Sequence, residues 1–326
     1  MNLKTRYLGL ELDNPIVVSS CGLSKNIEGV KNIEKAGAGA VVLKSMFEEQ
    51  IQAETNEAGK YVSVDSHTEA YDYLRNYSNE YSVTAYLDLV EKASQEVNIP
   101  IIASLNCVSP EGWTDYAKKL EESGADALEL NIGFMNNDIN KNSQEVEALY
   151  FDIVKAVLKK INLPVSVKIG PYFSSLAYFT SRLVTLGVEG LVLFNRFYRT
   201  DFDIDNFKYT SGSPFSKPEE ISLPLHWIAA LSSFIHCDFS GSTGVHDGKG
   251  VVKMLLAGAQ TVQVCSTLYK NNLDTIGEMK NMLSQWMKKN NFEDIDSFRG
   301  KMSRKESGQA EELDRVQYIK ALTGIE

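Results

Sequence analysis

The chain repeats one pattern along most of its 326 residues: a short, continuous apolar run is followed by a stretch in which apolar residues have helical spacing. Strands that are buried on both faces give such continuous runs, because neither face meets water. The unit occurs about eight times without a Gly/Ser-rich linker, which is typical of a (β/α)8 TIM barrel. The runs lie at 16–20, 40–44, 101–105, 127–131, 165–169, 190–194 and 261–265, and one further short run ends in the small residues 240–244.

The repeats are preceded by one small element and interrupted twice. Residues 3–12 carry alternating apolar side chains and a glycine, which is typical of a β-hairpin. The segments 45–83 and 195–223 each begin where a predicted strand ends, so we expect inserted loops over the C-terminal mouth of the barrel. We therefore predict a single α/β domain over residues 1–326. A doubly wound open sheet is the alternative, but its glycine-rich turn should follow the first strand, and here such turns come last.

Charge and cysteine content limit the partners. The net charge of -10 argues against binding to nucleic acid or to an anionic membrane surface, since both need a basic face. The four cysteines are widely spaced, which indicates buried thiols in a reducing compartment and neither a disulfide framework nor a metal site. No apolar run is long enough to span a bilayer or resembles a signal peptide. We expect a cytoplasmic protein that forms a homodimer and binds a small molecule.

The last two predicted strands end in small, hydrogen-bonding residues. Gly241, Thr243 and Gly244 follow the seventh strand, and Cys265 and Ser266 follow the eighth. Such turns can offer free backbone N–H groups to an anion, and the loops after the last two strands of a β/α barrel commonly hold a phosphate. The sequence predicts a phosphorylated cofactor or substrate here. The alternative is that the glycines only make tight turns.

Polar side chains also end the other predicted strands. In a barrel they converge on one mouth, and a lysine there is costly unless it meets an anion or a strong acceptor. A planar ligand with carbonyls and a delocalised negative charge fits such donors. For any single residue, a snorkelling lysine or a satisfied core amide is the alternative. The residues are Ser19, Ser20, Lys44, Ser45, Ser104, Asn106, Asn131, Lys168 and Asn195.

Several short motifs follow one another along the chain. They are Asn14-Pro15, Ser19-Ser20-Cys21, Lys44-Ser45, Glu129-Leu130-Asn131 with Asn136, Val167-Lys168, Asn195, Gly241-Ser-Thr-Gly244 and Cys265-Ser266. In this order, and over nearly the whole chain, they resemble the dihydroorotate dehydrogenase family, whose cytosolic class is the closer match. That family is an FMN-binding β/α barrel that oxidises dihydroorotate to orotate and passes the electrons to fumarate, NAD or a quinone.

The resemblance implies roles for individual residues. Contacts to the flavin ring and ribityl chain would come from Ser19, Ser20, Lys44, Ser45, Asn131 and Lys168. The phosphate would be held by Thr243, Gly244, Cys265 and Ser266, and the substrate would face Asn136 and Lys44. Lys168 would stabilise the negative charge of the reduced ring.

The substrate side departs from the family pattern. Phe134 stands where the family has its Cys or Ser base, and phenylalanine accepts no proton. Residues 66–70 replace a family segment that binds orotate, and they supply His67, whose imidazole titrates near neutrality and is the best replacement acid or base. The alternative is that His67 is a solvent-exposed loop histidine without a catalytic role. Arg196 replaces a Ser or Thr, and its guanidinium suits a carboxylate or phosphate of an anionic substrate.

Three functions follow from these residues. The first is an FMN-dependent oxidoreductase that acts on a CH–CH bond next to a carbonyl, with Lys44, Lys168 and His67 as catalytic residues and dihydroorotate or a related cyclic acid as substrate. The second is a phosphate-binding barrel lyase or aldolase in which Lys168 forms a Schiff base. The third is a non-catalytic FMN-binding relative.

Overall fold

The computed structural model describes residues 1–54, 82–109, 114–133, 136–197, 199–304, 316, 319–320 and 322–324. Eight parallel strands close into a barrel, because β4 pairs with both β3 and β6. The predicted (β/α)8 barrel is confirmed. Around the ring the strands are β3 (Ile16–Val18), β4 (Ala40–Val42), β6 (Ile101–Cys107), β7 (Ala127–Ile132), β8 (Val165–Ile169), β9 (Gly190–Leu193), β12 (Asp238–Ser242) and β13 (Thr261–Val264).

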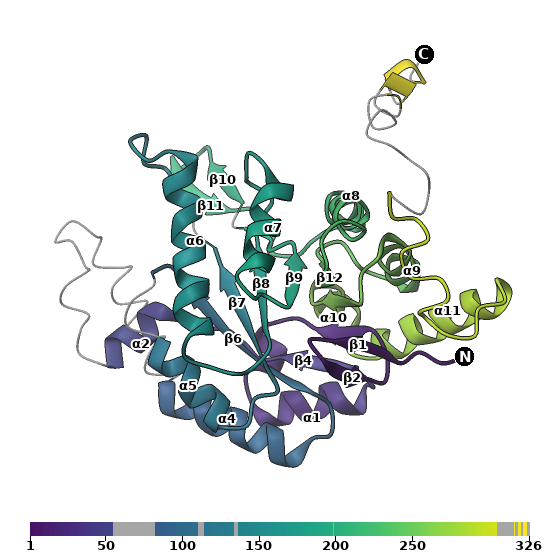
Figure 1. Ribbon diagram of the computed structural model, residues 1–326, viewed down its shortest axis with the longest axis horizontal. Helices are drawn as coiled ribbons and strands as arrows, with labels where there is room; N and C mark the ends of the chain where they lie inside the picture. The colour runs from purple at the N-terminus through teal and green to yellow at the C-terminus, as the bar shows by residue number, and fades with distance from the viewer. Residues whose placement is uncertain are drawn as a thin grey trace.

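Helices surround the strands (Figure 1). Side chains that are good N-caps begin four of them, at Asn26, Ser82, Asn142 and Asp247, and each accepts a hydrogen bond from the first turn. These caps determine where the four helices begin. The outer helices are α1 (Ile27–Lys35), α4 (Val83–Glu96), α5 (Thr114–Glu122), α6 (Ser143–Leu158), α7 (Leu176–Thr185), α8 (Ser222–Leu231), α9 (Gly248–Ala257) and α11 (Thr275–Lys289).

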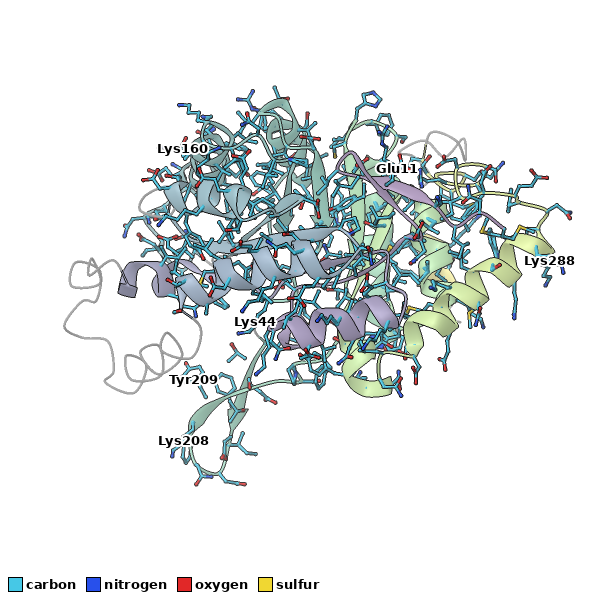
Figure 2. The ribbon with its side chains drawn as sticks, turned by 90° about the horizontal axis from the view of Figure 1, so that it is seen from below. Glu11, Lys44, Lys160, Lys208, Tyr209 and Lys288 are labelled. Carbon is cyan, nitrogen blue, oxygen red and sulfur yellow. The ribbon has the colours of Figure 1, made fainter. Side chains whose placement is uncertain are left out.

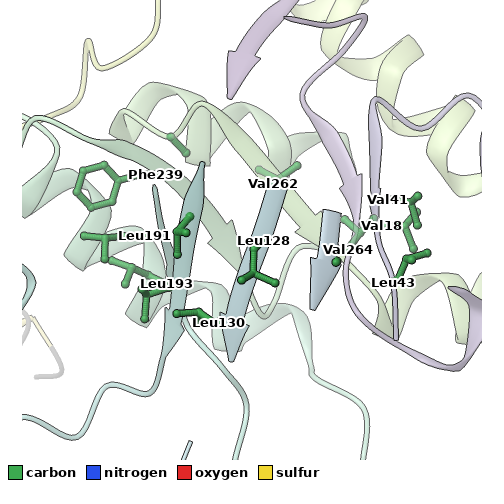
Figure 3. Packing of buried hydrophobic residues seen from close by; sticks show 14 of the residues in the cluster. Val18, Val41, Leu43, Leu128, Leu130, Leu191, Leu193, Phe239, Val262 and Val264 are labelled. Carbon is green, nitrogen blue, oxygen red and sulfur yellow. The ribbon is translucent and has the colours of Figure 1, made fainter. Parts of the chain in front are cut away.

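Side chains of the barrel strands alternate between two environments. Leu128 and Leu130 of β7 belong to the large core under the helices, which Figure 3 shows together with the equivalent residues of neighbouring strands. Because successive strand residues point to opposite faces, Glu129 and Asn131 point into the barrel. The apolar runs thus supply the outer core, and the polar residues among them lie inside the ring.

A small hairpin closes the barrel at the end where the strands begin. β1 (Thr5–Tyr7) and β2 (Leu10–Leu12) pair antiparallel, as predicted for residues 3–12. Tyr7, Leu8 and Leu12 form a second core cluster with residues from the strand starts. Gly190 leaves room for this plug, since a Cβ there would lie 2.6 Å from Cδ2 of Leu8. The opposite, C-terminal end of the barrel is therefore the one available for a ligand.

The two insertions contain elements that the sequence analysis did not predict. β5 (Met46–Phe47) and α2 (Glu48–Glu54) begin the first insertion. The expectation of an irregular second insertion is wrong, because β10 (Thr200–Asp203) and β11 (Lys208–Ser211) form a hairpin that stands clear of the body (Figure 2), and η3 (Pro218–Ile221) follows it. A short helix, α10 (Ser266–Asn271), also follows β13. His67 and Phe134 lie outside the described residues.

No helix in the described part of the chain is long and apolar enough to cross a bilayer. That residues 1–326 form a single domain stays a prediction.

Candidate active site

Three predicted residues lie level with one another at the C-terminal ends of adjacent strands. The register pairs Asn106 of β6 with Asn131 of β7, and Asn131 with Lys168 of β8. Asn195, just after β9, donates from Nδ2 to Oδ1 of Asn131 at 2.7 Å. The amides and the lysine therefore form a polar rim on one side of the mouth, as the strand-end positions predict.

Lys168 is buried and held on both sides. Its Nζ donates to Oγ of Ser19 at 2.8 Å and to Oε1 of Gln263 at 2.9 Å, and Ser19 itself donates to the same Gln263 oxygen. The ammonium is thereby fixed between β8, β13 and the end of β3. Gln263 was not among the predicted site residues, although a glutamine in the middle of an apolar run was a usable signal.

A carboxylate balances this ammonium. Glu129 of β7 has Oε1 at 3.7 Å from Nζ of Lys168, and its Oε2 accepts a hydrogen bond from Nε2 of Gln263. Oε1 has no hydrogen-bond partner among the described residues. A buried carboxylate is costly unless an opposite charge meets it, so the lysine and the glutamate stabilise each other. Sequence analysis assigned no role to Glu129, although a charged residue inside a buried strand indicates a special environment.

The serines predicted at strand ends are linked in a chain. Oγ of Ser20 lies 2.9 Å from Oγ of Ser45, which in turn lies 2.8 Å from Oγ of Ser104. Lys44, predicted to contact both flavin and substrate, does not line the cavity of Lys168. It lines a separate small cavity of about 20 Å³ with Ser45 and with residues of α2 and α4.

One cavity joins the Lys168 end of the site to the predicted phosphate turns. It has a volume of about 150 Å³ and also contains Gln263 and Ser216 in its lining. The structure thus brings the C-terminal ends of β3, β8, β9, β12 and β13 to one place. The predicted residues that line it are Ser19, Ser20, Lys168, Asn195, Arg196, Thr243, Gly244, Cys265 and Ser266.

The turn after β12 has an unusual backbone. Thr243 and Gly244 have φ values of 78° and 80°, in the left-handed region, and Oγ1 of Thr243 donates to the carbonyl of Phe194 at 3.1 Å. A Cβ on Gly244 would lie 2.1 Å from the backbone nitrogen of Ile221, so this position requires glycine. Gly241 lies outside the cavity lining. A Cβ there would lie 2.8 Å from Sδ of Met254, so helix packing accounts for this glycine.

Asn136, expected to face the substrate, lines another cavity. This cavity has a volume of about 260 Å³ and lies between the start of α6 and the loop after β8. The ring of Phe197 is part of its wall and packs on Gly170, where a Cβ would lie 2.1 Å from Cε2 of that ring. Among the described side chains, Asn136 therefore lies apart from the cavity of Lys168.

The thiol of Cys265 lines the cavity and lies in hydrogen-bonding contact with the thiol of Cys21. A hydrogen bond with Cys265 outweighs the effect of burial and lowers the pKa of Cys21 to about 7. The same bond, together with burial, raises the pKa of Cys265.

No group of three or more His, Cys, Asp or Glu residues in the described ranges could hold a metal ion.

The donors at this mouth fit a long, planar anion. The cavity lining combines an ammonium, hydroxyls and amides with small residues and the guanidinium of Arg196. Fixed donors of this kind suit carbonyl and phosphate oxygens.

Comparisons with known proteins agree with this arrangement. The family model described as dihydroorotate dehydrogenase matches residues 2–287. The dihydroorotate dehydrogenase B (NAD(+)) catalytic subunit of Methanocaldococcus jannaschii is 27% identical over 301 residues, which cover 89% of this chain and 95% of the relative. The subunits of the same name from Thermoplasma volcanium and Pyrococcus furiosus are 26% and 25% identical, and cover 92% and 90% of this chain and 98% and 97% of the relatives. The match of the family model over most of the sequence shows that the chain belongs to the dihydroorotate dehydrogenase family.

Proposed function

We propose that this protein is an FMN-dependent oxidoreductase that acts on a CH–CH bond next to a carbonyl, in dihydroorotate or a related cyclic acid. Membership of a flavin-dependent family supports this function. The observation that carries it is the cavity that joins buried Lys168 to the turn at Thr243 and Gly244.

Two groups of cavity residues would hold FMN. Ser19, Lys168 and Asn195 would contact the ring, and the turns at Thr243 and Ser266 would hold the phosphate. When bound, FMN supplies an acceptor for the hydride of the C–H bond. Lys168 supplies a fixed positive charge on a buried side chain, and such a charge acts strongly on a developing negative charge.

The geometry of Lys168 favours this function over a Schiff-base lyase. An amine nucleophile needs a free lone pair, whereas Lys168 donates two hydrogen bonds and lies beside the carboxylate of Glu129. These contacts suit a hydrogen-bond donor and an ion-pair partner, not a nucleophile.

The substrate side rests on residues that the described structure does not bring together. Lys44 and Asn136 would bind an anionic substrate, and His67 would take the proton, as the sequence predicts. The names of the relatives mention NAD(+), so NAD+ is the first electron acceptor to test.

We also propose that the protein forms a homodimer. We expect it to be located in the cytoplasm. The hairpin β10–β11 supports self-association, because Phe202, Ile204, Phe207 and Tyr209 are exposed on it. A mass measured by light scattering should be twice 36.3 kDa. A monomeric mass would contradict the dimer and leave the catalytic proposal intact.

The function is tested by anaerobic titration of the purified protein. We expect a yellow protein whose flavin absorbance is lost on addition of dihydroorotate or one of a panel of related cyclic acids. Colourless protein that is trapped by borohydride with a carbonyl substrate would indicate the lyase instead. Yellow protein that no donor reduces would indicate a non-catalytic flavin carrier.

A further inference from the structure

Arg196 shares one cavity with the predicted phosphate turns. It follows Asn195 at the end of β9 and lines the cavity together with Thr243, Gly244 and Ser266. The cavity that contains Asn136 does not include it. We infer that Arg196 binds the phosphate of the cofactor, an inference that rests on the proposed FMN-dependent function.

Protein groups hold two of the three guanidinium nitrogens. Nε donates to Oε2 of Glu220 at 3.1 Å, and Nη1 donates to the carbonyl of Ser213 at 2.7 Å. Nη2 makes no hydrogen bond with the residues that the structure describes and stays available to an anion. Arginine presents its donors in a rigid fork, so two fixed nitrogens orient the third.

The charges around Glu220 leave this end of the cavity positive. Arg199 donates from Nη2 to the same Oε2 of Glu220, so two guanidinium groups share one carboxylate. Burial raises the pKa of Glu220, but the hydrogen bond from the N–H of Lys217 and the contacts with Arg196 and Arg199 outweigh it, and the net effect is a lowered pKa. The carboxylate therefore stays ionised, and the group of three carries one surplus positive charge. A phosphate monoester carries between one and two negative charges near neutrality, which is opposite in sign to the surplus charge of these three side chains.

The segment that holds Arg196 also covers the predicted phosphate turn. Ser216 is buried and donates from its backbone N–H to Oγ of Ser266 at 2.9 Å, and the backbone of Ile221 packs directly on Gly244. Lys270 ties the segment down by donating to the carbonyl of Ser216 at 2.8 Å. Residues 213–221 thus contact both the arginine and the turn, and this shared segment links Arg196 to the proposed phosphate site.

The two arginines on Glu220 provide a matched comparison. The side chain of Arg196 is 16% exposed and lines the cavity, whereas that of Arg199 is 56% exposed and does not. The experiment measures dissociation constants of the apoprotein for FMN and for riboflavin, which lacks the phosphate, by quenching of flavin fluorescence. We expect R196Q to weaken FMN binding by about tenfold or more, because a charge-assisted hydrogen bond is lost, with riboflavin binding unchanged. R199Q removes a charge from the group but no donor from the cavity lining, so it should weaken FMN binding much less than R196Q does and leave riboflavin binding unchanged.

A second variant keeps the test informative if R196Q folds poorly. R196K retains the charge without the fork, so its FMN affinity should lie between those of wild type and R196Q. Equal loss of FMN and riboflavin affinity in folded R196Q, or unchanged FMN affinity with a raised KM for the donor, would overturn the inference. Wild-type apoprotein that binds both flavins equally well would overturn the inference but not the function. Wild-type apoprotein that binds neither flavin would overturn both.

Discussion

Nζ of Lys168 lies 3.7 Å from Oε1 of Glu129 inside the barrel, and the two side chains are only 8% and 1% exposed. Removing one partner of a buried ion pair leaves an uncompensated charge, which costs far more than the pair itself contributes. The pair is also neutral as a whole, so Glu129 sets how much positive charge the bound ring meets.

The first prediction concerns Glu129→Gln. The glutamine keeps the shape of the side chain but leaves the Lys168 ammonium unbalanced, so the free energy of unfolding of the apoprotein should fall by about 3–5 kcal/mol. In flavin-loaded protein, loss of the carboxylate leaves a net positive charge near the ring. This charge stabilises the reduced, negatively charged flavin, so the reduction potential of the flavin should rise. Urea unfolding and dye-coupled potentiometry measure the two effects.

The control for that variant is Glu96→Gln. Glu96 pairs with Lys31 at 2.6 Å on the surface, where both side chains are partly exposed. Exposed pairs contribute about 0.2–1 kcal/mol, so this variant should unfold almost as wild type does. Equal losses of stability in E129Q and E96Q, or an unchanged potential in E129Q, would show that the buried pair has no special role.

The second prediction concerns Lys168→Ala. Loss of a fixed charge at the reacting ring should slow flavin reduction by the donor on the order of 100-fold or more. Anaerobic stopped-flow absorbance gives this rate at saturating donor. Unchanged flavin content together with an unchanged rate would exclude Lys168 from catalysis.

The barrel could be predicted from the sequence because its strands are buried on both faces and read as unbroken apolar runs. Lys168, Asn131 and Asn195 could be predicted as site residues because they interrupt the ends of such runs. Glu129 and Gln263 lie in the middle of runs, and only the closed barrel shows that they face Lys168.

Other features depend on information that strand positions do not contain. The position of Lys44 at a strand end predicts where its backbone lies, but its long side chain reaches a different cavity. The β10–β11 hairpin has no buried face, so it lacks an apolar run, and its signal was the weaker alternation of Phe202 and Ile204 with aspartates. The prediction that Arg196 binds the substrate rests on its charge alone, and its partner Glu220, on which the proposed phosphate role depends, is visible only in the structure.

The third prediction concerns the thiol of Cys21. The thiolate is the form that reacts, so with a pKa of about 7 its alkylation by iodoacetamide should speed up roughly fivefold from pH 6 to pH 7 and little above pH 8. Burial raises the pKa of Cys237, so that thiol should react slowly over the same range. Mass spectrometry of the peptides follows each cysteine separately.

The partner of Cys21 provides the control for this profile. Cys265→Ala removes the hydrogen bond that lowers the pKa of Cys21, so the rise in reactivity should move to higher pH. The assignment would be refuted by identical pH profiles for Cys21 in the wild type and in C265A.

The fourth prediction compares two glycines with the same backbone conformation and different surroundings. Gly244 and Gly9 have φ values of 80° and 74°. A Cβ at Gly9 would meet nothing within 4 Å, whereas a Cβ at Gly244 would collide with the backbone of Ile221. Gly9→Ala should therefore cost only the left-handed conformation, about 1–2 kcal/mol. Gly244→Ala should cost about 2–5 kcal/mol, because the segment at Ile221 must also move.

Flavin affinity separates the two variants further. Displacement of Ile221 shifts the segment 213–221, which holds Arg196 through Ser213 and Glu220. Gly244→Ala should therefore weaken FMN binding more than riboflavin binding, while Gly9→Ala, at the closed end of the barrel, should leave both unchanged. Fluorescence titration and urea unfolding of the two variants test this directly. Equal stability losses in G9A and G244A would mean that the contact between Ile221 and the turn does not restrain the segment that holds the arginine.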